Sequence, residues 1–106
     1  MDEKPRTARL LSRQLFRSGT SIGANLEEAQ AGHSKADFIC KIEIALKEGR
    51  EACYWLRLVK ASEIAMGAPI GELLSEAEQL KRILGAIAVS AKDNQQVRAA
   101  KNSGAP

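Results

Sequence analysis

The feature that most constrains this chain is a helical seam of apolar and small residues between residues 38 and 59. Its members recur at alternating steps of four and three: Phe38, Ile42, Ala45, Gly49, Ala52, Leu56 and Val59. This heptad spacing is typical of a helix that packs along its length against other helices. Ile44, Trp55 and Leu58 fall on another side of the same helix. We therefore predict a helix over about 34–65 that must be covered on two faces.

A second helix is predicted over about 5–30, where Pro5 suits the first helical position. Its apolar stripe follows helical steps of three, four and seven: Ala8, Leu11, Leu15, Ile22, Leu26 and Ala29. Gly32 is a plausible stop for this helix. After it, Ser34 and Asp37 form a variant of the capping box that begins the central helix.

A third helix is predicted over about 69–92, beginning at Pro69 after Gly67 has ended the central helix. Its stripe again has steps of three and four: Ile70, Leu73, Ala77, Leu80, Leu84, Ile87 and Ala91. Residues 93–106 have almost no apolar content, so we expect a disordered tail there. The predicted fold is all-α: one up-and-down antiparallel bundle of three long helices, over residues 1–92.

Composition excludes several classes of protein. No apolar run approaches the roughly 20 residues of a membrane span, and the N-terminal sequence lacks the apolar core of a signal peptide. A cytoplasmic protein is therefore expected. Cys40 and Cys53 lie on one predicted helix about 20 Å apart, at ~1.5 Å per residue, too far for a disulfide bond. We expect both to be free thiols and small core residues.

The sequence contains few residues that could serve in catalysis. The only histidine, His33, lies in a predicted surface turn without a nucleophile or an orienting partner nearby. Glu43, Lys47 and Glu51 form an i, i+4 ladder that is typical of a solvated helix face. No Glu-x-x-His pair or Cys/His cluster marks a metal site. We expect no catalysis, no cofactor, no metal and no small-molecule substrate.

A basic stripe is the one anomaly in the charge pattern, in a chain whose net charge is +3. Arg6, Arg9, Arg13 and Arg17 lie within about 80° of arc on the predicted first helix. No acidic residue occurs between residues 4 and 26. A solvated arginine face is the simplest interpretation. The alternatives are contact with an acidic protein partner or a nucleic-acid phosphate track.

The stretch RSGTSIGANLEEAQ, residues 17–30, keeps helical spacing although it contains Gly19 and Gly23. Glycines cost about 1 kcal/mol each inside a helix, which is offset if another helix approaches the backbone closely. Packing within one bundle is the favoured reason, ahead of a subunit contact and a phosphate site. Ser21 and Asn25 stand four residues apart, so we expect Asn25 to be at least half-buried and hydrogen-bonded there.

Two sequence blocks stand out: QLFRSGTSIGANLEEAQ at residues 14–30 and SKADFICKIEIALKEGREACYWLRL at residues 34–58. They resemble a bacterial family of four-helix-bundle proteins, first noticed as products of intervening sequences in 23S ribosomal RNA genes. The first block matches the family pattern at Gln14, Leu15, Arg17, Ser21, Ile22, Asn25, Leu26 and Glu28. The second matches it at Ser34, Asp37, Phe38, Ile39, Ile44, Ala45 and Glu51. Ala29 departs from the family's usual glycine, and Gly23 stands where many members have proline.

The resemblance implies a bundle that assembles as a homopentamer and has no assigned enzymatic activity. It implies four helices, of which we expect three here, because about a dozen residues precede the first block. It also relates the chain to the accessory protein of diversity-generating retroelements, which binds a reverse transcriptase and nucleic acid. We therefore expect a homo-oligomeric scaffold or adaptor, or else a nucleic-acid-associated accessory protein. Gly19, Ser21, Gly23, Asn25 and Glu28 are the expected packing or assembly residues.

Overall fold

The computed structural model describes residues 4–64 and 69–103 and contains three α-helices. They are α1 (Lys4–Ala31), α2 (Lys35–Ser62) and α3 (Ile70–Ser103). No strand occurs in the part of the chain that the structure describes. The all-α fold predicted from the helical periodicity is confirmed.

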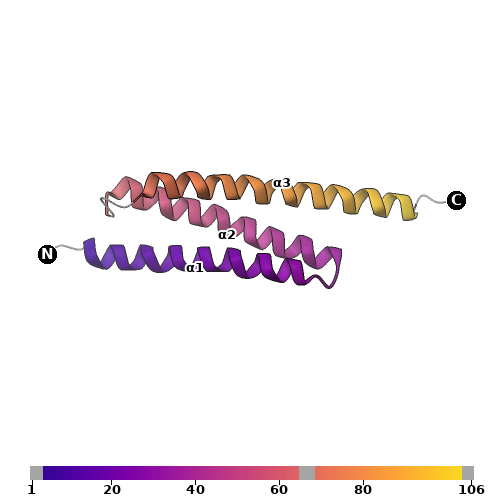
Figure 1. The fold of residues 1–106 in the computed structure, drawn as a ribbon, viewed down its shortest axis with the longest axis horizontal. Coiled ribbons are helices and arrows are strands. Elements are labelled where there is room, and N and C mark those ends of the chain that lie inside the picture. Colours follow the sequence, from indigo (N-terminus) through magenta and orange to yellow (C-terminus); the bar gives the residue numbers. More distant parts are fainter. Residues whose placement is uncertain (1–3, 65–68, 104–106) are drawn as a thin grey trace.

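The three helices form an open layer with α2 in the middle (Figure 1). α1 and α3 each pack against α2, but they do not pack against each other within residues 4–64 and 69–103. Successive helices run antiparallel, so α1 and α3 point the same way. The molecule is elongated, with principal extents of 73, 21 and 18 Å. One long side of the core is therefore left without a covering helix.

A short turn joins α1 to α2 as predicted. Gly32 has a φ of 26°, a conformation that side-chain-bearing residues rarely adopt. Ser34 then caps α2, because its side-chain oxygen accepts a 3.0 Å hydrogen bond from the backbone N–H of Asp37. His33 is exposed in this turn.

The end of α2 comes earlier than expected. Glu63 adopts a left-handed conformation, with φ 55°, and its N–H donates to the carbonyl oxygen of Lys60. This terminates the helix at Ser62 rather than near residue 65. The expected stop at Gly67 lies outside the described residues.

The prediction of a disordered tail from residue 93 is wrong for residues 93–103, which continue α3 to Ser103. The tail was inferred from the lack of apolar residues, and side chains 93–102 are indeed exposed. However, this segment is rich in Ala, Gln, Lys and Arg, which favour helix, and contains no Gly or Pro before Gly104. Propagating an existing helix is far easier than nucleating a new one.

The core follows the predicted seam of α2. Ile42, Ala45, Gly49, Ala52, Leu56 and Val59 are buried, and Phe38 is half-buried. Three further α2 residues are buried that the seam did not include: Ile39, Leu46 and Cys53. Cys40 is exposed, so only one of the two free cysteines is a core residue. On the second apolar face of α2, Ile44 and Leu58 remain 36% and 37% exposed and Trp55 is half-buried, so the helices of the described chain cover this face only in part.

Candidate functional site

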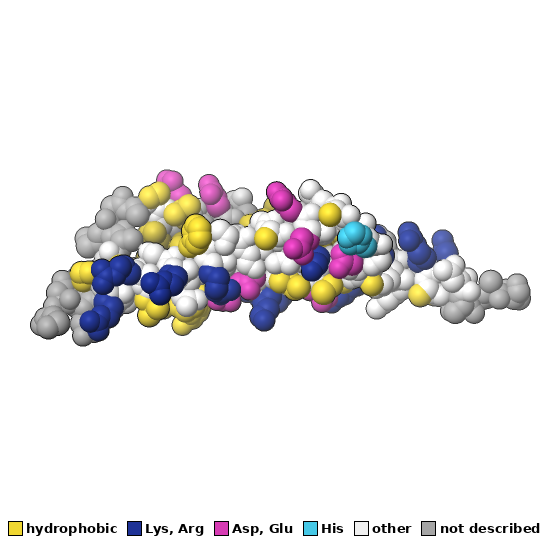
Figure 2. Space-filling view, turned by 90° about the horizontal axis from the view of Figure 1, so that it is seen from below, with side chains coloured by type: hydrophobic (Ala, Val, Ile, Leu, Met, Phe, Trp, Pro, Cys, Tyr) yellow, Lys and Arg dark blue, Asp and Glu magenta, His cyan; other side chains and the backbone are white. Residues whose placement is uncertain are grey.

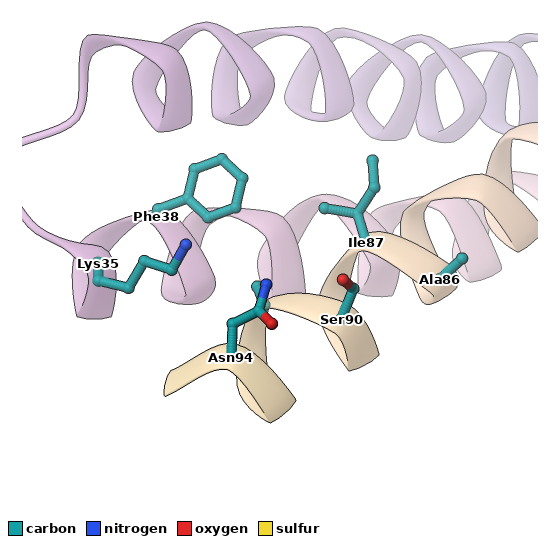
Figure 3. Close-up of a pocket in the computed structure, with 7 residues that line it drawn as sticks. Lys35, Phe38, Ala86, Ile87, Ser90 and Asn94 are labelled. Atoms are coloured by element: carbon teal, nitrogen blue, oxygen red, sulfur yellow. The ribbon is translucent and has the colours of Figure 1, made fainter. Parts of the chain in front are cut away.

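The uncovered side of the core is the first candidate for a binding surface. Half-buried apolar side chains from all three helices pack against the buried core along it: Leu15, Leu26, Phe38, Leu80 and Ile87. We call these residues the open core edge. Two depressions, of about 350 and 330 Å³, adjoin it and share Lys35 and Phe38. The first is shown in Figure 3, where Phe38 of α2 and Ile87 of α3 point toward α1.

Gly19 and Gly23 lie beside this open core edge on α1. At ~100° per residue, Gly19 lies about 40° round the helix from Leu15, and Gly23 lies about 60° round it from Leu26. Both glycines lie on the side of these leucines that faces away from the buried stripe. A Cβ atom built on either glycine would meet no atom within 4 Å. The favoured expectation, that these glycines pack inside the bundle, is therefore wrong for the described chain, because they lie beyond the α1–α2 contact. They leave a smooth helix surface next to exposed apolar side chains.

Large apolar side chains are exposed along the outer helices as well. Phe16 on α1 is 73% exposed, and Leu73 and Ile83 on α3 are 43% and 57% exposed. Single exposed apolar residues are ordinary, but contiguous exposed apolar surface marks interaction sites. These side chains add exposed apolar surface to α1 and α3 that a further helix could cover.

Asn25 is half-buried and hydrogen-bonded, as predicted. Its side-chain nitrogen donates to the Ser21 carbonyl oxygen at 2.9 Å and to the Ser21 hydroxyl at 3.3 Å. Glu28, one turn further, forms a 3.0 Å ion pair with Lys41 of α2. Asn25 therefore stabilises α1 locally, whereas Glu28 joins α1 to α2.

The basic surface of α1 is the second candidate. Arg6, Arg9 and Arg13 are exposed, and none forms an ion pair with the residues the structure describes. Figure 2 shows Lys and Arg side chains in a row along the N-terminal half of α1. No acidic residue occupies the first turn of α1, so the described part of this helix supplies no carboxylate next to the row.

Arg17 does not belong to this free row. Its guanidinium donates to Glu48 at 3.2 Å, to Glu51, and to the Ser18 hydroxyl at 3.2 Å. Glu51 also accepts a 3.1 Å hydrogen bond from the Trp55 ring nitrogen. Arg17 thus fastens α1 to α2, and the expectation that it contacts a partner is replaced by a structural role.

Ser18 was missed by the sequence reasoning, although it is fully buried. It lies seven residues after Leu11 and four before Ile22, which is a position in the apolar stripe of α1. This position in the stripe could have predicted that Ser18 is buried, but a serine is not counted in a search for apolar residues. Because its hydroxyl accepts from Arg17, the burial leaves no unsatisfied polar group.

The hydrogen bond from Trp55, and then that from Arg17, hold the pKa of Glu51 below its ordinary value of 4.5. A lowered folded-state pKa contributes stability above the unfolded-state pKa, and this stability is lost as the pH falls through the folded value. Glu51→Gln should therefore lower the free energy of unfolding at pH 7, and its difference from wild type should shrink below about pH 4. Urea unfolding at pH 7, 4 and 3 measures this.

The matched control is Glu27→Gln, which removes an exposed carboxylate that forms no ion pair with the described residues. It should change the stability little at any of the three pH values. A Glu51→Gln penalty that stays constant down to pH 3 would contradict the ionic explanation.

Possible metal ligands do not cluster in the described residues. No group of three or more His, Cys, Asp or Glu side chains there could hold a metal ion. The expected ladder of Glu43, Lys47 and Glu51 is not formed: Glu43 pairs with Lys92 of α3 and Glu51 with Arg17. No helix in the described ranges is long and apolar enough to cross a membrane.

The 23S rRNA-intervening sequence protein family model matches residues 3–86. The chain belongs to this family. The match covers α1, α2 and the first half of α3, and thus the whole open core edge except Ile87. The extension of α3 that the structure adds lies beyond the residues matched.

One solved structure is similar in both sequence and fold to this member of the 23S rRNA-intervening sequence protein family. It is a protein of unknown function from the S23 ribosomal protein family of Bacteroides thetaiotaomicron VPI-5482. The two chains are 41% identical over 74% of this chain and 72% of the other, with a TM-score of 0.69. No match was found among curated proteins.

Proposed function

We propose that this chain is a non-enzymatic helical assembly module that associates with further copies of itself and acts as a scaffold or adaptor. The observation that carries the proposal is the open core edge. Apolar side chains of all three helices stay half exposed there. Beside them lie two glycines whose Cβ positions have no described atom within 4 Å, apart from the neighbouring residues and backbone of α1 itself. A homopentamer is the assembly that the family resemblance favours.

The energetics support association. Burial of apolar surface yields ~25 cal/mol per Å², so about 400 Å² of newly covered surface yields about 10 kcal/mol before the cost of association is subtracted. Glycines allow a second helix to approach α1 closely without displacing side chains. The close helix contact in the assembly therefore offsets the unfavourable helix propensity of the two glycines in the isolated chain.

The test replaces both glycines with a bulky residue, as Gly19→Leu with Gly23→Leu. Because no side chain of the other described helices lies within 4 Å of either Cβ position, the helices should form normally. Self-association should be lost, because the new side chains occupy the space of the incoming helix. Sedimentation velocity at micromolar concentration gives the mass, and circular dichroism gives the helix content.

The matched control is Ala24→Leu, which adds a similar bulk at an exposed position on another side of α1. It should assemble like the wild type. A wild-type chain that stays monomeric, with a melting temperature independent of concentration, would overturn the proposal.

A second candidate function is binding of RNA or DNA, or of a reverse transcriptase, through Arg6, Arg9 and Arg13. The exposure of these three side chains without ion pairs among the described residues favours it. Phosphate contacts bind without sequence preference, and their affinity falls steeply with salt.

Arg9→Glu with Arg13→Glu should weaken binding to unrelated RNA and DNA oligomers about equally. It should also reduce the slope of log affinity against log salt by roughly 2. Fluorescence anisotropy across a salt series measures both quantities. Lys60→Glu with Arg82→Glu is the control, since it makes the same charge change at exposed positions on α2 and α3. Equal weakening in both variants would show an effect of net charge alone.

A further inference from the structure

Three cationic side chains gather where the beginning of α2 meets the extension of α3. Lys35, Arg98 and Lys101 line one depression of about 260 Å³, together with Asn94 and Val97. None of the three cations forms an ion pair with the residues that the structure describes. No acidic side chain lines the depression. This is a concave surface with an uncompensated positive charge.

The register of α2 and α3 explains why these residues meet. Lys92 of α3 pairs with Glu43 of α2, and the two helices are antiparallel. Continuing about two turns along α3 therefore reaches the residues opposite Lys35, at the N-terminal end of α2. The cluster exists because α3 stays helical beyond residue 92, which the sequence pattern did not predict.

A second depression, of about 350 Å³, adjoins the first and shares Lys35 and Asn94 with it. Its other lining residues are Phe38, Ala86, Ile87, Ser90 and Ala91. Figure 3 shows these side chains around one opening, with Lys35 and Phe38 extending from α2, and Ile87, Ser90 and Asn94 from α3. The Lys35 ammonium lies 5.8 Å from the centroid of the Phe38 ring. An apolar surface with a few polar groups thus continues directly into the cationic one.

We propose that these two depressions together bind a nucleotide phosphate, with the phosphate at Lys35, Arg98 and Lys101 and the nucleoside against Phe38 and Ile87. We call this composite surface the Lys35–Arg98 site. It goes beyond the proposed self-association, although the two surfaces share Phe38 and Ile87 of the open core edge. It also lies at the other end of the molecule from the N-terminal arginines of α1.

The chemistry of the lining selects this ligand class. A phosphate monoester carries about −1.5 to −2 charges and three acceptor oxygens, which three cations match better than they match a single carboxylate. An arginine guanidinium offers a planar fork of donors suited to phosphate. The Ser90 hydroxyl and the Asn94 amide each donate and accept, as the edge of a nucleobase requires. Ligand sites commonly combine an apolar lining with a few such polar groups.

The test compares adenosine monophosphate, adenosine and inorganic phosphate by calorimetry on the full chain, with amide chemical shifts to locate the contact. Adenosine monophosphate should bind more tightly than either fragment and should shift the amides around residues 35, 94 and 98. Arg98→Gln with Lys101→Gln should weaken its binding at least tenfold. Both side chains are exposed on an extension that contributes nothing to the core, so folding should be unaffected.

The matched control is Lys60→Gln with Arg82→Gln, which removes two exposed charges that line neither depression. It should leave the affinity for adenosine monophosphate unchanged. No binding at millimolar concentration, or an equal loss in both variants, would overturn the site. An RNA tetramer with a 5′-phosphate that competes more effectively than adenosine monophosphate identifies a strand end as the source. A less effective tetramer identifies a free nucleotide.

Discussion

Leu84→Ala should lower the free energy of unfolding by about 2–5 kcal/mol, the range for a buried leucine that leaves a cavity. Leu84 is 1% exposed and lies at the centre of the α2–α3 contact. Its Cδ1 atom lies 3.8 Å from the Cβ position of Gly49, so the leucine covers a place on α2 where the helix has no side chain of its own. Nothing on the α2 side can extend to fill the space. Urea unfolding followed by circular dichroism measures the loss.

Val89→Ala on the same helix is the control, because Val89 is 60% exposed. Truncating it should change the stability by no more than about 0.5 kcal/mol. If the two variants lose the same amount, Leu84 is not the residue that fixes α3 to α2.

Ala45→Leu should destabilise the chain by about 1–3 kcal/mol or more, through overpacking. Ala45 is 0% exposed, and the core around it is already filled by Ile22, Ile42 and Leu46. Three extra carbon atoms can be accommodated only if the helices move apart, which separates the neighbouring apolar contacts as well. The measurement is again the free energy of unfolding, at a concentration low enough to hold the assembly state constant.

Ala36→Leu is the matched control on the same helix, since Ala36 is exposed in the first turn of α2. It should be nearly neutral, because Leu and Ala both favour helix and no neighbour is displaced. An Ala45→Leu variant as stable as Ala36→Leu would mean that the contacts of α2 are loose enough to absorb a leucine.

Helical periodicity was sufficient to predict the three helices and most of the buried seam of α2. Periodicity is a property of local residue spacing, and residues at heptad spacing lie on one side of a helix. In a bundle that side packs against the neighbouring helices. The sequence could not show that α1 and α3 avoid each other, because that depends on the angle between two contacts on α2. Because α1 and α3 contact α2 at different places around its circumference, more of α2 is buried than one heptad seam. The additional buried residues are Ile39, Leu46 and Cys53.

The candidate sites were harder to predict than the fold. The arginines of α1 were found as a stripe, but sequence spacing could not tell that Arg17 reaches carboxylates on α2, more than 30 residues away in the chain. The Lys35–Arg98 site was missed because its residues are far apart in sequence and meet only through the α2–α3 register. Periodicity also underestimated α3, since a segment without apolar residues can remain helical through intrinsic propensity alone.

The position of α2 between two helices that do not touch gives the molecule the mechanics of a hinge. A change in the angle between α1 and α3 breaks no direct contact between them in the described part of the chain. The width of the open core edge depends on that angle. We therefore expect a guest helix to be accommodated by a change in this angle, with less change in the α1–α2 and α2–α3 packing.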